Sequence, residues 1–321
     1  MRHQLKERTE TLKRIAYDLG FSFVGVSKAE RLDKEARKLE EWLNQGHHGE
    51  MQYMEGHFDK RVDPTLLVPG AKSVVSLMYN YHNPDRAQDP ESPKIAQYAY
   101  GRDYHKVLKK KLKRLIQMTE EELNLTIQGR AFVDSAPVME REWARRSGIG
   151  WMGKHTLMIH PKAGSYFFLA ELIIDLPMEY DGPMKDYCGR CTRCIEACPT
   201  DAIAPEGYWL DASKCISYLT IELKKQIPSS FSGQMENWMF GCDICQEVCP
   251  WNRFAERHQE TDFEPHPDLL KMQKHEWEEL TEEVFRELFK GSAVKRAKFE
   301  GLTRNIRFLQ SADSSPENKE E

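Results

Sequence analysis

The chain has 321 residues, of which 40% are hydrophobic and 30% are charged, and its formal net charge is −5. This length suits about two ordinary domains, and the negative charge gives no whole-molecule sign of a nucleic-acid partner. No apolar run is long enough for a membrane span, and residues 1–10 lack the apolar stretch of a signal peptide. We therefore expect a cytoplasmic protein that enters no membrane and acts as a monomer.

The first 176 residues carry the helix and strand signals of a mixed domain. Apolar residues at helical spacing predict a helix that ends at Gly20. The expected helices are 5–19, 36–43 and 107–116, and the expected strands are 21–26, 73–81 and 130–133. Residues 157–159 and 166–175 are expected to form a hairpin. Together these signals predict an α+β domain of α/β-like character over residues 1–176.

The rest of the chain divides into three segments of different composition. Residues 177–256 are rich in Cys, Pro and Gly and contain no long strand. Residues 257–310 return to helical spacing, with helices expected over 281–289 and 295–309. Residues 311–321 are acidic and Ser-rich, which predicts a disordered tail.

All eight cysteines lie between Cys188 and Cys249. Clustered thiols in a cytosolic chain favour metal binding over a disulfide framework. The first run matches C-x2-C-x2-C-x3-C-P in full, and in two-cluster ferredoxins the fourth Cys of such a run ligates the other cluster. We therefore predict a ferredoxin-like domain over residues 177–256 with two [4Fe–4S] clusters. The expected ligands are Cys188, Cys191, Cys194 and Cys249 for the first cluster, and Cys198, Cys215, Cys242 and Cys245 for the second.

Other interpretations of the cysteines stay open. Two zinc sites are possible in principle, but zinc sites seldom use this spacing. Taken alone, the cysteines describe only a non-catalytic iron–sulfur electron carrier. Such a carrier would leave about 240 further residues without an explanation.

Several stretches, in order, resemble epoxyqueuosine reductases, a family that uses cobalamin and iron–sulfur clusters to convert epoxyqueuosine to queuosine in tRNA. The resemblance covers nearly all of residues 1–310 and implies the last step of queuosine biosynthesis, at the wobble position. Besides the first cysteine run, the matching stretches are YGRDYH (100–105), DSAPVMER (134–141), GWMGKHTLMIHPKAGSYFFLAEL (150–172), CISYLTIE (215–222) and GCDICQEVCPWN (241–252). Family members often continue into further helical repeats of the HEAT type, whereas this chain has one HEAT-like unit. This difference concerns tRNA binding more than chemistry.

The implied reaction removes an epoxide oxygen and needs two electrons, a proton and a strong reductant. Clusters supply single electrons, while a low-valent cobalt delivers them to carbon. Asp134 is the expected proton donor, with a pKa raised by burial beside the corrin. Without the resemblance, Asp134 reads more readily as a turn residue or as the N-cap of a helix from Pro137.

The resemblance also implies cobalamin contacts. Arg141 is expected to pair with Asp134 or with a cobalamin amide, although a solvated helix charge is the plainer interpretation. The D-x-H-x-x-G signature of cobalt binding is incomplete at Asp103-Tyr104-His105, so we expect no His to ligate cobalt from below. The full set of expected contacts is His57, Gln97, Asp134, Arg141, Lys154, His155, Met158, His160, Ser217 and Asp243. Each could also be an ordinary core, loop or capping residue.

Two basic stretches favour an RNA partner. Phosphates attract Lys and Arg, and a modified anticodon base must swing out to reach a pocket. Residues 290–309 are the better candidate, because the basic run over 102–114 is equally well a solvated helix face. The expected tRNA contacts are Lys224, Lys295, Arg296, Lys298 and Arg304.

A reductive dehalogenase is the other enzyme class that remains open, because it would use similar cofactors. That class usually carries an export signal and has no use for a basic C-terminal helix. In either enzyme an external low-potential donor is expected to supply the electrons.

Overall fold

A computed structural model of the chain describes residues 2–313, so most of the expected acidic tail lies outside the described residues. The N-terminal half is built on a four-stranded antiparallel sheet in the order β1-β2-β7-β4. The strands are β1 (Phe23–Lys28), β2 (Ser73–Asn80), β7 (Phe167–Ile174) and β4 (Gly129–Phe132). A mixed fold of helices and strands is thereby confirmed.

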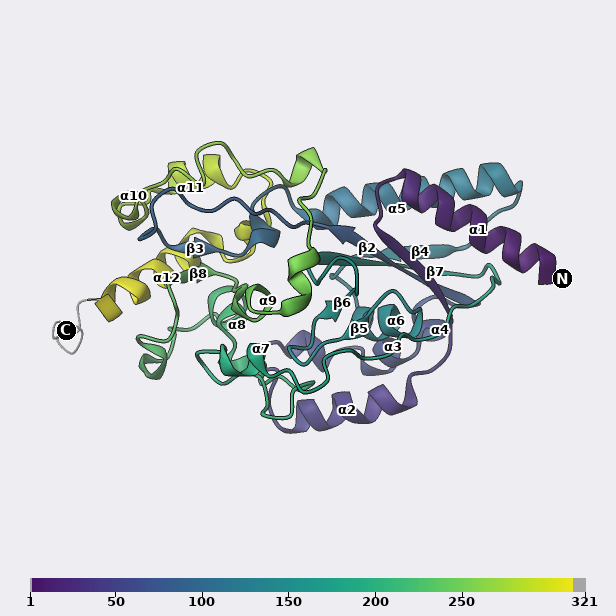
Figure 1. Cartoon of the computed structure of the whole chain (residues 1–321), viewed down its shortest axis with the longest axis horizontal. Helices are drawn as coiled ribbons and strands as arrows, with labels where there is room; N and C mark the ends of the chain where they lie inside the picture. The colour runs from purple at the N-terminus through teal and green to yellow at the C-terminus, as the bar shows by residue number, and fades with distance from the viewer. Residues whose placement is uncertain (1, 314–321) are drawn as a thin grey trace.

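Side chains alternate along β2, and each face of the sheet has its own helices. Val75, Leu77 and Tyr79 pack in one core with α1 and α5, whereas Val74 and Met78 contact the helices of the opposite face. Figure 1 shows α1 and α5 on one side of the sheet and α2, α3, α4 and α6 on the other. The helices are α1 (Arg2–Asp18), α2 (Asp33–Asn44), α3 (Phe58–Val62), α4 (Pro64–Leu67), α5 (Tyr104–Leu123) and α6 (Glu140–Arg146).

The prediction that residues 157–159 and 166–175 form a hairpin is wrong. β6 (Met158–Ile159) pairs with β5 (Trp151–Met152), and β7 lies in the central sheet between β2 and β4. Most of β7 is buried, which suits a strand with a neighbour on each side and helices on both faces.

The second half of the molecule has a separate hydrophobic core to which distant segments contribute. Buried side chains from residues 95–100, 216–240 and 269–309 meet in it. Its elements are β3 (Lys94–Ile95), which pairs with β8 (Trp238–Phe240), and the helices α8 (Ile216–Ile221), α10 (Lys274–Glu278), α11 (Glu282–Leu288) and α12 (Lys298–Asp313). The last expected helix therefore begins at Lys298, because a separate 3-10 turn occupies Ala293–Arg296.

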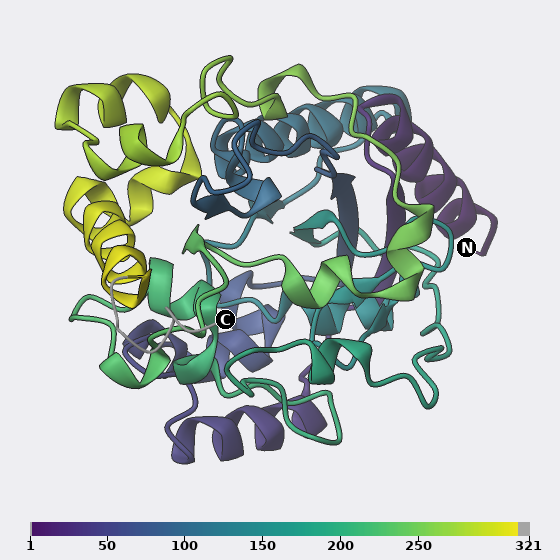
Figure 2. The same ribbon diagram turned by 60° about the vertical axis from the view of Figure 1, so that its left-hand side comes forward.

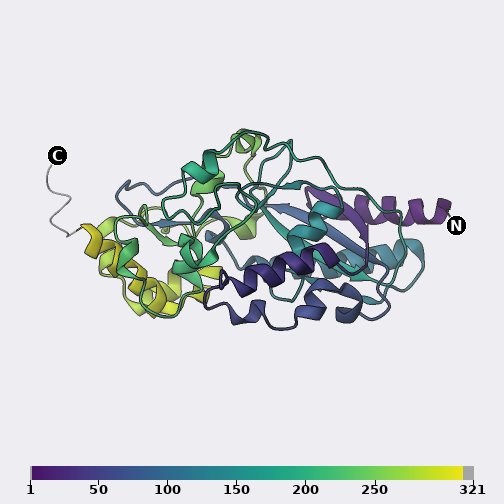
Figure 3. The ribbon, with the colours of Figure 1, turned by 90° about the horizontal axis from the view of Figure 1, so that it is seen from below.

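The cysteine loops lie between the two halves, as Figure 2 shows. They carry the short helices α7 (Arg193–Glu196) and α9 (Ile244–Glu247), which pack against each other. The remaining 3-10 turns are Gln52–Met54, Gln97–Ala99, Ala212–Lys214, Ser229–Phe231, Pro250–Phe254 and Thr261–Phe263. The molecule is elongated, with α1 at one end and α12 at the other (Figure 3). Within residues 2–313, no helix combines the length and the apolar character that crossing a membrane requires.

Candidate active site and cluster sites

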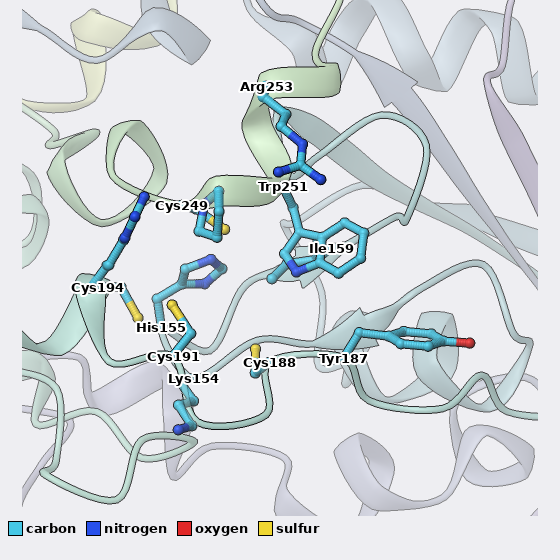
Figure 4. Close-up of a pocket in the computed structure, with 12 residues that line it drawn as sticks. Lys154, His155, Ile159, Tyr187, Cys188, Cys191, Cys194, Cys249, Trp251 and Arg253 are labelled. Carbon is cyan, nitrogen blue, oxygen red and sulfur yellow. The ribbon is translucent and has the colours of Figure 1, made fainter.

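The cysteines fall into two groups in space. The four expected around the first cluster all line one pocket of about 230 Å³ (Figure 4), although they come from two separate segments. Burial, together with the neighbouring thiols of Cys188 and Cys249, raises the pKa of the Cys194 thiol to about 11. The structure thus brings together the members of the first expected set.

Cys198, Cys215, Cys242 and Cys245 form the other group. Burial and then the thiols of Cys215 and Cys198 raise the pKa of Cys242. Burial and then Cys242 and Cys215 raise the pKa of Cys245. All eight cysteines are free, so no disulfide competes for these thiols.

The number of thiols in each group suits a four-iron cluster. Four thiolates on one zinc lie about 3.8 Å apart, because the Zn–S bond is about 2.3 Å long. Among residues 2–313, no three His, Cys, Asp or Glu side chains come close enough together to hold one metal ion. In a four-iron cluster each thiolate binds a different iron, so one cluster needs four thiolates, which is the number in each group. The donor sets therefore fit two [4Fe–4S] clusters.

His155 and Lys154 line the first cysteine pocket rather than a separate cofactor site. His155 is 3% exposed, and burial lowers its pKa to about 4, so the ring is neutral. Its Nδ1 accepts a hydrogen bond from the Leu157 N–H at 3.1 Å, which places the ring proton on Nε2. That Nε2–H is buried and has no acceptor in the described part of the chain. A sulfur atom of a cluster would satisfy it.

Asp134 lies in an irregular loop between β4 and α6. Its φ of 53° is in the left-handed region, and α6 begins only at Glu140, so Asp134 does not cap a helix from Pro137. The Asp134 N–H donates to Glu140 Oε1 at 2.6 Å. Its Oδ2 accepts a 2.6 Å hydrogen bond from the Tyr104 hydroxyl and lies 3.4 Å from His105 Nε2. The Asp134 side chain still exposes 60% of its surface, so a substrate can reach it.

The pKa of Asp134 is lowered by its protein neighbours, and the pKa expected for it beside a corrin stays a prediction. Burial acts to raise the pKa of Asp134, but hydrogen bonds from His105 and Tyr104 outweigh burial and lower it. Burial acts to lower the pKa of His105, and hydrogen bonds to Asp134 and Asp103 raise it instead. The Asp103 Oδ1 lies 2.7 Å from His105 Nδ1. The protons at this site therefore belong to a connected group of side chains and not to one carboxyl.

Two more carboxyl groups lie beneath this loop. Burial raises the pKa of Glu140 to about 8 and that of Glu171 well above its ordinary value, and the two side chains interact with each other. Glu171 is fully buried on β7, opposite Ser76 of β2. Within the described residues its oxygens meet no N–H or O–H donor, so the pair holds at least one proton near neutral pH.

Gln97 and Asp243 contact each other at the second cysteine group. The Gln97 N–H donates to Asp243 Oδ2 at 2.8 Å, and Gln97 Oε1 accepts from the Asn83 N–H at 3.1 Å. Gln97 is 4% exposed, and its Nε2 has no acceptor in the described residues. A buried amide without an acceptor needs an explanation. The amide oxygens on the edge of the expected cobalamin would provide one.

Three other expected cofactor residues keep accessible positions. His57 is exposed and precedes α3, and Ser217 is half-buried beside Cys215. Arg141 donates to the Thr156 carbonyl oxygen at 2.7 Å and to its Oγ1 at 3.1 Å. The expected pairing of Arg141 with Asp134 is therefore wrong, because the arginine holds the β5–β6 turn instead.

Met158 and His160 were expected to contact cobalamin, and in the structure both side chains pack against other residues. Met158 is buried in a small apolar cluster with Met78. The His160 ring stacks on Phe23 with ring centroids 3.4 Å apart, and burial lowers its pKa to about 4. Both side chains pack in the N-terminal core, and their contact with cobalamin stays a prediction.

The residues expected to bind tRNA have different partners within the protein. Arg304 makes five hydrogen bonds, to the carbonyl oxygens of Leu219, Leu223 and Lys225 and to Asn305. All five donors of its guanidinium are then used, so we correct Arg304 to a structural residue that caps the end of α8.

The other basic candidates remain available. Lys224, Lys295 and Lys298 are exposed. Arg296 binds both carboxylate oxygens of Glu222, at 2.7 and 2.9 Å. Its charge also lowers the pKa of Asp134, so the C-terminal region reaches the surroundings of the catalytic loop.

Sequence reasoning missed four residues of this site. Tyr104 and His105 belong to the YGRDYH stretch, but nothing in that stretch shows that they meet Asp134. No pattern in the sequence pointed to Glu140 as a site residue. Glu171 could have been found, because a single Glu within the apolar strand FFLAELII is unusual in a buried position.

Comparison with known proteins gives consistent matches along the chain. Residues 61–135 match the family model described as epoxyqueuosine reductase QueG, DUF1730, and residues 187–252 match the 4Fe-4S double cluster binding domain. The epoxyqueuosine reductase of Cyclobacterium marinum is 56% identical over 97% of this chain and 99% of its own length. The Escherichia coli epoxyqueuosine reductase is 40% identical over 94% of this chain and 80% of its own length.

Solved structures agree with these matches. A crystal structure of epoxyqueuosine reductase with an epoxyqueuosine-modified tRNA-Tyr stem loop superposes with a TM-score of 0.86 at 31% identity. That match covers 95% of this chain and 81% of the other. The epoxyqueuosine reductase of Streptococcus thermophilus gives a TM-score of 0.85 at 30% identity, over 96% of this chain and 82% of the other.

Proposed function

Because this chain belongs to the epoxyqueuosine reductase family, we propose that it reduces epoxyqueuosine to queuosine at the wobble position of tRNA. In this reaction an epoxide, two electrons and two protons give an alkene and water. The observation that carries the proposal is the hydrogen-bonded group of Asp134, Tyr104 and His105 in one molecule with two four-cysteine sites. Such a site can supply protons and electrons to the same substrate.

The cofactors of this reaction are two [4Fe–4S] clusters and cobalamin. We assign the pocket of Cys188 and Cys249 to the first cluster, and the group of Cys242 and Cys245 to the second. When bound, cobalamin supplies a low-valent cobalt that cleaves a carbon–oxygen bond. Gln97 and Asp243 would bind its amide groups next to the second cluster, since the Gln97 Nε2 is unused. Further contacts would come from His57, Arg141 and Ser217.

Asp134 would give its proton to the leaving oxygen. Its resting pKa is low, so the carboxylate must receive that proton from a neighbour. Hydrogen bonds to Asp134 and Asp103 raise the pKa of His105, so this ring is the neighbour suited to hold that proton. Its Nε2 lies 3.4 Å from Asp134 Oδ2 and can pass the proton on. Tyr104 holds the carboxylate in place during this transfer.

We propose that tRNA approaches from the C-terminal region, because the charge of Arg296 acts on Asp134. Exposed Lys295, Lys298 and Lys224 would contact phosphates. In this division of the chain, residues 1–176 bind cobalamin, 177–256 hold the clusters, and the HEAT-like segment 257–310 contacts tRNA. The protein would act as a monomer in the cytoplasm, where its substrate is found.

The test uses a deletion strain and the reconstituted enzyme. Nucleoside analysis of tRNA should show epoxyqueuosine accumulating without the gene, and unchanged queuosine would refute the proposal. Asp134→Asn should retain the visible spectrum of bound cobalamin and lose turnover by about 10²- to 10⁴-fold. Asp33→Asn is the matched control, because the Asp33 side chain is 73% exposed on α2. Undiminished turnover of Asp134→Asn would reject Asp134 as the acid.

A further inference from the structure

The surface beside the first cysteine pocket is open and lined by arginine. An open depression of about 430 Å³ adjoins that pocket, and Arg193, Cys249, Pro250 and Arg253 line both. Arg86 lines the depression from a different segment. A ligand of the first cluster therefore borders a surface that another protein can reach.

Aromatic side chains lie beside this depression, where Tyr187 and Trp251 line the adjoining first cysteine pocket. Tyr187 and Phe254 expose 48% and 38% of their surfaces. The Trp251 ring lies between them, with its centroid 6.0 Å from that of Tyr187 and 6.2 Å from that of Phe254. The Arg253 guanidinium lies 4.5 Å from the centre of the Phe254 ring. We call this area the donor face, and define it by Arg86, Tyr187, Arg193, Trp251, Arg253 and Phe254.

The donor face is positively charged in a chain whose net charge is −5. Arg86 pairs with Glu247 at 3.4 Å. Arg193 and Arg253 are both exposed, and neither has a carboxylate within ion-pair distance among residues 2–313. Unpaired, exposed arginines attract an acidic partner over a distance and speed its encounter. Arg, Tyr and Trp are also the residues most often found at interface hot spots.

We propose that the donor face docks a small acidic protein that carries single electrons at low potential. The inference rests on the proposed function, which consumes two electrons per epoxide. In each encounter the carrier is oxidised by one electron and the first cluster is reduced by one. Two encounters, with two protons, account for the alkene and the water. Interfaces of such carriers are small, below about 1,200 Å².

RNA is the competing occupant of a basic surface. The modified base must reach Asp134, whose charged surroundings include Arg296 of the C-terminal region. The donor face instead borders Cys249 and the first cysteine pocket. Electron entry is therefore the role that its position favours.

The test compares two reductants of the reconstituted holoenzyme. The double variant Arg193→Glu/Arg253→Glu should be reduced about 10- to 100-fold more slowly than wild type by a reduced acidic [2Fe–2S] ferredoxin in stopped flow. Photoreduced deazariboflavin, which is small and uncharged, should reduce both proteins equally fast. Arg37→Glu is the control, because Arg37 is exposed on α2 and lines neither the first cysteine pocket nor the adjoining depression. For wild type alone, the ferredoxin rate should fall steeply with salt.

Two outcomes would overturn the proposal. An unchanged ferredoxin rate in the double variant would show that the carrier docks elsewhere. A loss of tRNA affinity in the same variant, measured by fluorescence anisotropy, would assign the face to RNA. Turnover of epoxyqueuosine tRNA with deazariboflavin separates the two proposals, since its absence in wild type would refute the proposed function and not the docking face.

Discussion

The hydrogen bond from Tyr104 to Asp134 sets the pH at which the acid works. Tyr104→Phe removes this 2.6 Å bond and keeps the ring stacked on Phe168, with ring centroids 4.1 Å apart. A hydrogen bond to a charged group is worth about 1.5–3 kcal/mol. We take the low end, about 1.5 kcal/mol, because the Asp134 side chain exposes 60% of its surface. That energy corresponds to a tenfold weaker acid, or about one pH unit.

The assay is the pH profile of kcat/KM with epoxyqueuosine tRNA. The limb that falls at alkaline pH reports the loss of the proton that Asp134 and His105 share. The bond favours the carboxylate and lowers the pKa of Asp134, so its loss should leave more of that proton on Asp134 and move the limb to higher pH by up to about one pH unit. The matched control is Tyr79→Phe, which removes a 2.7 Å hydrogen bond from a buried tyrosine to Glu260, outside the site. An unmoved limb in Tyr104→Phe, or an equal shift in Tyr79→Phe, would refute the reasoning.

Three further predictions follow from buried polar groups. His155→Leu should lower the midpoint potential of one cluster in an EPR titration, because the cluster loses an N–H donor. Arg304→Met should cost about 2–3 kcal/mol in denaturant unfolding and spare tRNA affinity, whereas Lys295→Ala should reduce affinity and spare stability. Glu171→Gln should leave the melting temperature nearly unchanged below pH 4.5 and raise it increasingly at higher pH, since a raised native pKa makes wild-type stability fall as pH rises above the ordinary pKa of Glu, 4.5.

Each of these predictions has a result that contradicts it. Equal potentials in wild type and His155→Leu would show that Nε2 does not face the cluster. A loss of tRNA affinity in folded Arg304→Met would return Arg304 to the RNA contacts. A melting difference for Glu171→Gln that is the same at acidic and alkaline pH would mean that Glu171 does not titrate between the two.

Strong periodicity and local spacing made much of the fold predictable. The long helices and the four sheet strands follow from apolar residues at regular intervals, because one face of each must be buried. The grouping of the cysteines followed from the C-x2-C-x2-C-x3-C-P motif, whose fourth cysteine, Cys198, ligates the second cluster and not the first. The pairing of β5 with β6 was not predictable, because two-residue strands leave no periodic pattern.

The electrostatics of the site could not be derived from the sequence. The pKa of Asp134 depends on Tyr104 and His105, which lie on α5, about 30 positions away along the chain. Arg304 and Lys295 look alike as basic residues of a C-terminal helix. Only packing shows that one binds carbonyl oxygens and the other is free to meet a phosphate.

The second hydrophobic core bears on how the protein is made. It needs residues from 95–100 through to 269–309, so it cannot close until nearly the whole chain has left the ribosome. The N-terminal sheet, by contrast, is complete once β7 has emerged. All eight thiols are therefore exposed to the cell before the segments around them are packed.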